Sequence, residues 1–180
     1  MRLDPKYFNI FIGSLGIFAI VLIGYFTISY FMGQQVEFKE RIGDGEEVRQ
    51  TEFDVFYTGE VVTIEDYQGR PVVLDFWATW SGRSQQAHKV LSEFKRQYPD
   101  LVVLSALVKD DETSLQMYEE DYDYDFTYVK GTDVYQDFLV PGVPTYVIFD
   151  RQGEVLDVVV GFRDDETFNR LSEYLTAHEE

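Results

Sequence analysis

An uncharged apolar stretch near the N-terminus is the feature that most restricts what this chain can fold into. No charged residue occurs at positions 7–36, and the run from Tyr7 to Gly33 reads YFNIFIGSLGIFAIVLIGYFTISYFMG. About 20 apolar residues are enough for a helix to cross the hydrocarbon core of a bilayer. A cleavable signal peptide would have a shorter apolar region and a small-residue cleavage site. The sequence therefore predicts an uncleaved membrane anchor over residues 1–33, with a transmembrane helix over about residues 7–32.

The charges that flank this stretch do not decide its orientation. Arg2 and Lys6 precede it, whereas Lys39, Arg41 and Arg49 follow it. Orientation depends on the bias of Lys and Arg between the two sides and little on Asp and Glu. The count is close to a tie, so it leaves open which side of the membrane holds the rest of the chain.

The remaining residues are sufficient for one domain with its own core. Residues 34–51 are polar and charged and contain GDGEE, so we expect a tether there and a domain over residues 52–180. The chain has 33 acidic and 15 basic residues and a formal net charge of −18. Such a surface repels phosphates, so we expect no nucleic-acid partner.

The residue types present also exclude several chemistries. The chain has no cysteine and only two histidines, His88 and His178. Disulfides, thiolate metal sites and cysteine nucleophiles are therefore excluded, and so is a histidine-rich metal site. We expect neither a metal nor another cofactor.

An acidic segment, DDETSLQMYEEDYDYDF over residues 110–126, resembles a metal site only superficially. Asp121, Asp123 and Asp125 are spaced like the start of a calcium loop. Such a loop needs Gly at its sixth position and Glu at its twelfth, and this chain has Phe126 and Thr132 there. We interpret the segment as a solvated acidic surface that could attract a basic partner.

Apolar periodicity and turn residues predict strands that alternate with helices and a final hairpin and helix. This order indicates an α/β or α+β sandwich. We expect Asp164 or Asp165 to cap the last helix. The predicted strands lie within 53–64 (a hairpin) and over 72–78, 101–108, 145–150 and 154–160, and the predicted helices cover 84–98, 113–122 and 166–177.

Two separated motifs carry a family resemblance. GRPVVLDFWATWSGRS, ending at Ser84, and VPGVPTYVIFDRQGEVLDVVVG, over residues 140–161, resemble the membrane-anchored thiol–disulfide oxidoreductases of the TlpA/ResA type. The resemblance covers about residues 52–178. It implies a thioredoxin-like fold, a three-layer α/β/α sandwich, with Pro144 at the cis-proline position. It also implies that the domain lies outside the cytoplasm, in the periplasm or at the outer face of the cell membrane.

The residues that would carry the family's chemistry are missing. The positions that match its redox motif are Trp80, Ser81, Gly82, Arg83 and Ser84, and the family has cysteine where this chain has the two serines. A serine hydroxyl is barely ionised at neutral pH and forms no disulfide. Thiol–disulfide exchange through these positions is therefore chemically impossible. We therefore expect no catalytic residue of this type.

Asp75 and the Ser84–His88 pair are further candidates for chemistry near the motif. The resemblance places Asp75 at a buried-acid position that helps proton transfer, with a pKa raised by burial, but no cysteine is left for it to serve. Ser84 and His88 are four residues apart and could form a serine–histidine pair on one helix face. Against a serine hydrolase, Ser81 could simply cap the helix while His88 faces solvent, and no acid to orient the histidine is evident.

Two interpretations of the function remain. In the first, the domain is a redox-inactive binding or scaffold module whose groove pairs with an extended peptide of a protein partner. The groove would be formed by Trp80, Ser81, Val143 and Pro144. In the second, the chain is a Cys-to-Ser form of a working oxidoreductase that reduces disulfides, for example in cytochrome c maturation. Arg83 and Gln85 also depart from the family pattern, which favours natural divergence and the first interpretation.

Overall fold

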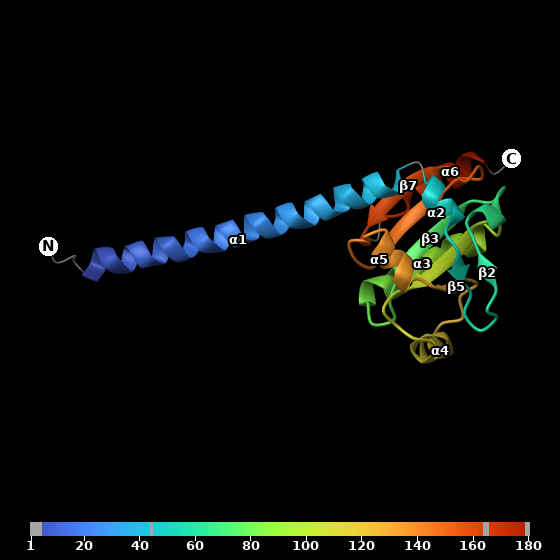
Figure 1. The fold of residues 1–180 in the computed structure, drawn as a ribbon, viewed down its shortest axis with the longest axis horizontal. Coiled ribbons are helices and arrows are strands. Elements are labelled where there is room, and N and C mark those ends of the chain that lie inside the picture. The colour runs from blue at the N-terminus through green and yellow to red at the C-terminus, as the bar shows by residue number, and fades with distance from the viewer. Residues whose placement is uncertain (1–4, 44, 164–165, 179–180) are drawn as a thin grey trace.

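The computed structural model of the protein describes residues 5–43, 45–163 and 166–178. Figure 1 shows a long N-terminal helix that projects from a domain containing the remaining elements. Arg2, which entered the orientation count, and the two candidate caps Asp164 and Asp165 lie outside the described residues.

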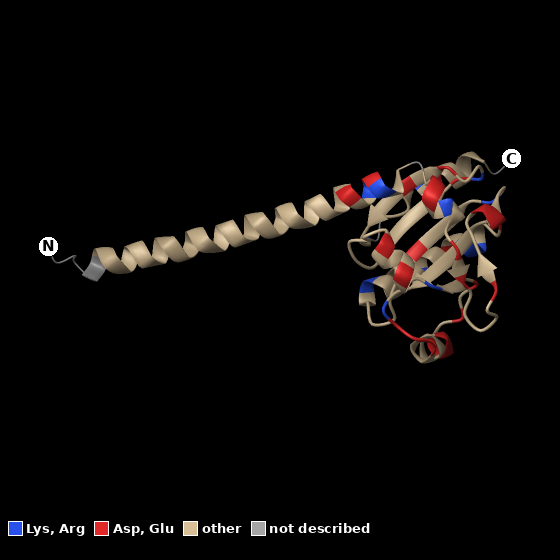
Figure 2. Ribbon diagram, viewed as in Figure 1, with Lys and Arg blue, Asp and Glu red and all other residues tan. Residues whose placement is uncertain are grey.

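Helix α1 (Pro5–Ile42) contains the predicted span. It is the one helix among the described residues that is long and apolar enough to cross a membrane, with a mean hydropathy of 2.2 in its most apolar part. Its side chains from Tyr7 to Met32 are almost all exposed, and Figure 2 shows no charged residue along this part of it. Apolar side chains exposed along a whole helix fit a lipid environment and not water.

The segment expected to be a polar tether differs from that expectation. Helix α1 continues without a break to Ile42, and a short helix α2 (Glu46–Gln50) follows it. Phe38 and Ile42 are 0% and 2% exposed, and Val48 is 1% exposed. Because Phe38 and Ile42 are four residues apart, they lie on the same side of α1, and this side packs into the domain. The segment is therefore helical and in part belongs to the core.

The turn between α1 and α2 is as closely packed as the helices. Gly45 has a φ of 81°, and a Cβ atom added to it would lie 2.5 Å from Cγ2 of Val155. Arg49 of α2 donates to the carbonyl oxygen of Gly153 at 3.3 Å and forms a 2.9 Å ion pair with Glu154. The glycines of the GDGEE stretch thus permit close packing where the sequence indicated a flexible linker.

A five-stranded mixed sheet lies at the centre of the domain, in the order β5-β4-β3-β6-β7. Strands β3, β4 and β5 are parallel, while β6 and β7 run antiparallel to their neighbours. All residues of β3 and β4 are buried, as expected for strands covered on both faces. The strand bounds are β3 (Val72–Trp77), β4 (Val102–Leu107), β5 (Thr127–Lys130), β6 (Thr145–Phe149) and β7 (Val155–Val160).

Helices cover both faces of the sheet and complete the predicted three layers. Helices α3 (Gly82–Gln97) and α6 (Asn169–Ala177) pack on one face. The end of α1, α2 and α5 (Thr132–Asp137) pack on the other face. The remaining elements are the hairpin of β1 (Phe53–Asp54) and β2 (Val61–Val62), the 3-10 turn η1 (Glu65–Tyr67) and α4 (Glu112–Asp121).

The predicted strands and helices of the domain are confirmed with shifts of a few residues. Helix α2, the 3-10 turn η1, strand β5 and helix α5 were not predicted. Strand β5 has four residues and α5 has six. Elements this short show little periodicity, so the sequence gives a weak signal for them.

Candidate functional site

The motif turn connects the end of β3 to the start of α3. The side chain of Ser81 caps α3, because its Oγ accepts a hydrogen bond from the N–H of Ser84 at 3.2 Å. Ser84 is fully buried, whereas Trp80 is 66% exposed. Arg83 turns toward the domain and donates from Nη1 to the carbonyl oxygen of Phe162 at 2.9 Å. One motif serine is thus a helix cap and the other is inaccessible to solvent.

The loop before β6 lies beside this turn. Phe76 near the end of β3 pairs with Thr145 at the start of β6, so the turn after β3 and the loop before β6 leave the same end of adjacent strands. The Val143–Pro144 peptide bond in this loop is cis. The N–H of Gly161 donates to the carbonyl oxygen of Pro144 at 2.8 Å. The fold therefore brings the two sequence motifs together at one end of the sheet.

A buried polar network lies directly beneath the motif turn. His88 Nε2 is 2.6 Å from Oδ2 of Asp75, and His88 Nδ1 is 2.9 Å from the hydroxyl of Tyr118. Ser105 Oγ lies 3.4 Å from both Asp75 Oδ2 and His88 Nε2. The ring of Trp77 packs 4.3 Å from that of His88, measured between centroids. Asp75 and His88 are both 0% exposed.

This network corrects the expectation that His88 faces solvent. Ser84, Ala87, His88 and Leu91 are the buried residues of α3, and they follow the spacing of one helix face. His88 therefore belongs to the face that packs on the sheet. The expectation that no acid orients the histidine is wrong as well, because Asp75 on β3 contacts it.

The same geometry argues against a serine hydrolase. Both ring nitrogens of His88 are engaged, one by Asp75 and the other by Tyr118. The Oγ of Ser84 is buried and forms no hydrogen bond with any residue that the structure describes. A nucleophilic serine needs access to substrate and a base that can take its proton, and Ser84 has neither.

Several other buried polar atoms surround Asp75. Within the described ranges, Asp75 Oδ1, Trp77 Nε1 and the hydroxyls of Tyr128 and Tyr146 have no hydrogen-bond partner. Burial raises the pKa of Tyr118, Tyr128 and Tyr146, and the nearby carboxyl of Asp75 raises each further. These hydroxyls therefore keep their protons at neutral pH, and the region around Asp75 contains polar groups that apolar packing alone does not satisfy.

The acidic segment forms local structural contacts. Asp110 accepts hydrogen bonds from the backbone N–H and the hydroxyl of Thr79, next to the motif turn. Asp111 caps α4 by accepting from the N–H of Ser114 at 2.8 Å, and this bond lowers the pKa of Asp111. Across residues 5–43, 45–163 and 166–178, no group of three or more His, Asp or Glu residues is placed to hold a metal ion.

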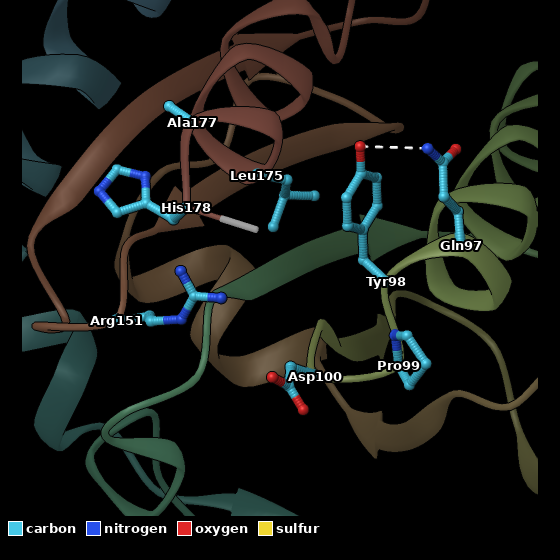
Figure 3. A pocket seen from close by; sticks show the side chains of 8 residues that line it. All are labelled: Gln97, Tyr98, Pro99, Asp100, Arg151, Leu175, Ala177 and His178. Carbon is cyan, nitrogen blue, oxygen red and sulfur yellow. Dashed lines mark hydrogen bonds between the residues drawn. The ribbon is translucent and has the colours of Figure 1, made fainter. Parts of the chain in front are cut away.

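A recess of about 750 Å³ lies far from the motif turn. Figure 3 shows its side chains, which come from the end of α3, the following turn, Arg151 and the end of α6. Val72 at the start of β3 pairs with Val102 and Phe149, so Asp100 and Arg151 lie at the opposite end of the sheet from Ser81. This recess is therefore separate from the candidate site.

Comparisons with known proteins agree with this arrangement. Residues 69–155 match a family model described as thioredoxin-like. The globular part of the chain has a thioredoxin-like fold. Thioredoxin-like protein YneN of Bacillus subtilis (strain 168) is 27% identical over 154 residues, which cover 81% of this chain and 88% of YneN. Thiol-disulfide oxidoreductase ResA of Bacillus thuringiensis subsp. konkukian is 26% identical over 121 residues, 65% of this chain and 68% of ResA.

Solved structures are similar to the same thioredoxin-like domain. A putative thiol:disulfide interchange protein DsbE from Chlorobium tepidum has a TM-score of 0.62 and 25% identity, covering 72% of this chain and 94% of that one. MTB dsbF, in its mixed oxidised and reduced forms, has a TM-score of 0.61 and 27% identity, covering 72% and 95%. The chain is thus similar to proteins named as thiol–disulfide oxidoreductases, while it contains no cysteine.

Mutation of the buried network tests its structural role. Replacing His88 by Leu leaves the carboxyl of Asp75 and the hydroxyl of Tyr118 without their partner, so we expect a loss of about 1–3 kcal/mol in the free energy of unfolding for each group. Denaturant unfolding of the His88→Leu and Asp75→Asn variants and of the double variant measures the coupling between the two residues. We expect Asp75→Asn to cost clearly less in the His88→Leu background than in the original chain.

The exposed neighbour provides a matched control. Gln86→Leu lies on the solvent side of the same helix and should leave the free energy of unfolding nearly unchanged. Costs of the two single variants that simply add in the double variant would contradict the network.

Proposed function

We propose that this protein is a membrane-anchored, redox-inactive thioredoxin-like module that binds an extended segment of a protein partner. The observation that carries the proposal is the state of the two motif serines. Ser81 caps α3 and Ser84 is buried beneath it, so neither is placed for chemistry. The neighbouring Trp80 is 66% exposed, whereas Pro144 is buried. Relatives named as thiol–disulfide oxidoreductases support a site that contacts other proteins.

The groove would be formed by Trp80, Ser81, Val143 and Pro144. Trp80 offers an exposed aromatic ring, and Ser81 and Val143 are half-buried. Among the described residues, none forms a hydrogen bond with the backbone N–H or C=O of Val143. Free backbone groups beside an exposed aromatic side chain suit the addition of an extended peptide, which gains main-chain hydrogen bonds and a side-chain contact.

The proposal also covers location and organisation. We place the anchor at residues 1–33 and the domain at the outer face of the membrane, as the resemblance to membrane-anchored oxidoreductases supports. The segment over residues 34–51 joins the two, and its buried residues favour counting it with the domain from Phe38 onward.

The alternative proposal is a Cys-to-Ser form of a working oxidoreductase. The fold around the motif supports it, because a cysteine at position 81 would lie at the N-terminus of α3, where a thiolate is favoured. Arg83 favours natural divergence instead. This residue departs from the family pattern, and its hydrogen bond to the carbonyl oxygen of Phe162 fixes the motif turn to the rest of the domain.

A paired insulin-reduction assay separates the two. We expect no activity from the original chain, and none from the Ser81→Cys/Ser84→Cys variant, because the surroundings have diverged. Circular dichroism of both proteins verifies that they are folded. Strong activity of the variant would favour the Cys-to-Ser alternative, and any activity of the original chain would contradict redox inactivity.

A binding assay tests the groove itself. As a probe we choose carboxymethylated insulin B chain, an extended peptide without free thiols. Removal of an aromatic anchor from an interface costs about 2 kcal/mol or more, which is about 30-fold in affinity, so Trp80→Ala should weaken binding by that factor. Met117→Ala removes another exposed apolar side chain, on α4, and should have no effect. Equal affinity of both variants for the probe would exclude Trp80 from the binding surface.

A further inference from the structure

Helix α1 fixes how the domain is held relative to the membrane. It is continuous from Pro5 to Ile42, and its last turns are locked to the domain by Phe38 and Ile42. No proline or glycine lies between Gly33 and Ile42 that would give the helix a hinge. One side of the domain contacts the residues of α1 that directly follow the span. Because α1 is rigid, this is the side of the domain that faces the membrane.

That side is the motif end of the sheet. Gln35 and Lys39 of α1 line a recess of about 290 Å³ together with the end of β7 and Gly161. Gly161 donates to Pro144, and the next residue, Phe162, accepts from Arg83. The cis-proline loop and the start of α3 are thus connected, through one or two hydrogen bonds, to residues that lie beside α1.

A second contact joins α1 to the loop that precedes the cis proline. Arg41 donates to the carbonyl oxygen of Asp137, the last residue of α5, at 3.3 Å. Leu139, two residues further, has a φ of 53° and is 46% exposed. Figure 1 shows α5 and the start of α3 on the side of the domain that faces back along α1, while β2 lies on the far side.

When the hydrocarbon core ends at Gly33, Gln35 lies at the depth of the lipid headgroups and Lys39 lies just beyond them. With a rise of about 1.5 Å per residue, Gln35 and Lys39 are about 3 Å and 9 Å beyond Gly33 along the helix. The headgroup region adds about 5–7 Å to each side of the hydrocarbon core. A recess that begins beside Gln35 therefore begins within the headgroup region when α1 spans the bilayer.

The exposed side chains at this end suit that environment. Trp80 and Leu139 are exposed and apolar, and tryptophan is enriched at membrane–water interfaces. Arg83, three residues after Trp80, adds positive charge at this end. Arg163 lines the recess beside α1 and is 3.3 Å from Glu166. The chain as a whole is strongly acidic, so basic side chains at this end reduce the repulsion from phosphate headgroups.

We propose that Trp80 and Leu139 form a lipid-contacting edge that rests on the headgroup region of the membrane that α1 crosses. The domain therefore has a restricted orientation, and it contacts the bilayer through the turn before α3 and the loop after α5. The groove next to Trp80 then opens along the membrane surface. This inference rests on the docking of α1. It assigns to lipid the same exposed Trp80 ring that the proposed groove would offer to a peptide, so the two would compete for it.

The two tryptophans of the chain make the contact measurable. Trp77 is 0% exposed and Trp80 is 66% exposed, so the difference in emission between the original chain and Trp80→Phe reports on Trp80. We place the full chain in phosphatidylcholine nanodiscs, with and without a spin label on the lipid headgroup. We expect the labelled lipid to quench most of this difference emission and aqueous acrylamide to quench little of it.

Two further variants make the result specific. Seven polar helix-forming residues inserted after Gln34 lift the domain by about 10 Å and turn it by nearly two full turns, so the lipid quenching should be lost while acrylamide quenching rises. Leu139→Asn, which suits the left-handed backbone at this position, should reduce the lipid quenching, whereas Val61→Asn on β2 should not.

Two outcomes would overturn the proposal. Trp80 emission that is quenched by acrylamide and not by the labelled lipid would show that this end of the domain faces water. Emission that neither quencher reaches would show that a second copy of the chain or another part of the domain covers Trp80 in place of lipid.

Discussion

The packing of Phe38 and Ile42 on the sheet is the interaction on which the rest of this molecule depends. Burial of large apolar side chains contributes about 1.5–3 kcal/mol each, so separating α1 from the domain would cost several kcal/mol. The two residues are part of the same core as the apolar side chains of β3, β4 and β6. The end of α1, the candidate membrane helix, is therefore part of one outer layer of the fold.

With α1 in a bilayer, as we propose, this docking gives the domain a fixed relation to the membrane. A flexible tether would let the motif end of the sheet face any direction. Such freedom would suit binding to a soluble partner. In the structure, the recess beside Gln35 and Lys39 places the end of β7 and the cis-proline loop next to the membrane-proximal turns of α1. Partners that reach the proposed groove would do so at the membrane surface.

The second constraint is the network beneath the motif turn. Asp75, His88 and Tyr118 join β3, α3 and α4, three elements that meet at the candidate site. Buried polar groups of this kind are stabilising only when they satisfy each other. The network thus uses the histidine and the buried acid for structure, and the two motif serines are left as a helix cap and a sealed side chain.

The sequence predicted the parts of this structure that carry strong periodicity or a family motif. The buried run of β3, the face of α3 and the closing hairpin of β6 and β7 all follow from residues that the sequence displays plainly. The docking of Phe38 was missed because it lies between charged residues in a polar stretch, and only the fold shows which side is covered. His88 was misplaced because its charged neighbours suggested a solvated face, although its spacing from Leu91 and Ser84 matches the buried one.

Amide hydrogen exchange of the full chain in nanodiscs, followed by mass spectrometry, tests the docking of α1 most directly. The segment over residues 38–42 begins about 8 Å beyond Gly33 along the helix, outside the headgroup region, so lipid does not protect it. The account predicts that its amides exchange as slowly as those of other well-packed helices of the domain, because Phe38 and Ile42 hold it in place. Exchange at the rate of an unstructured peptide would show that the segment is a flexible tether and that the domain is not fixed to its membrane helix.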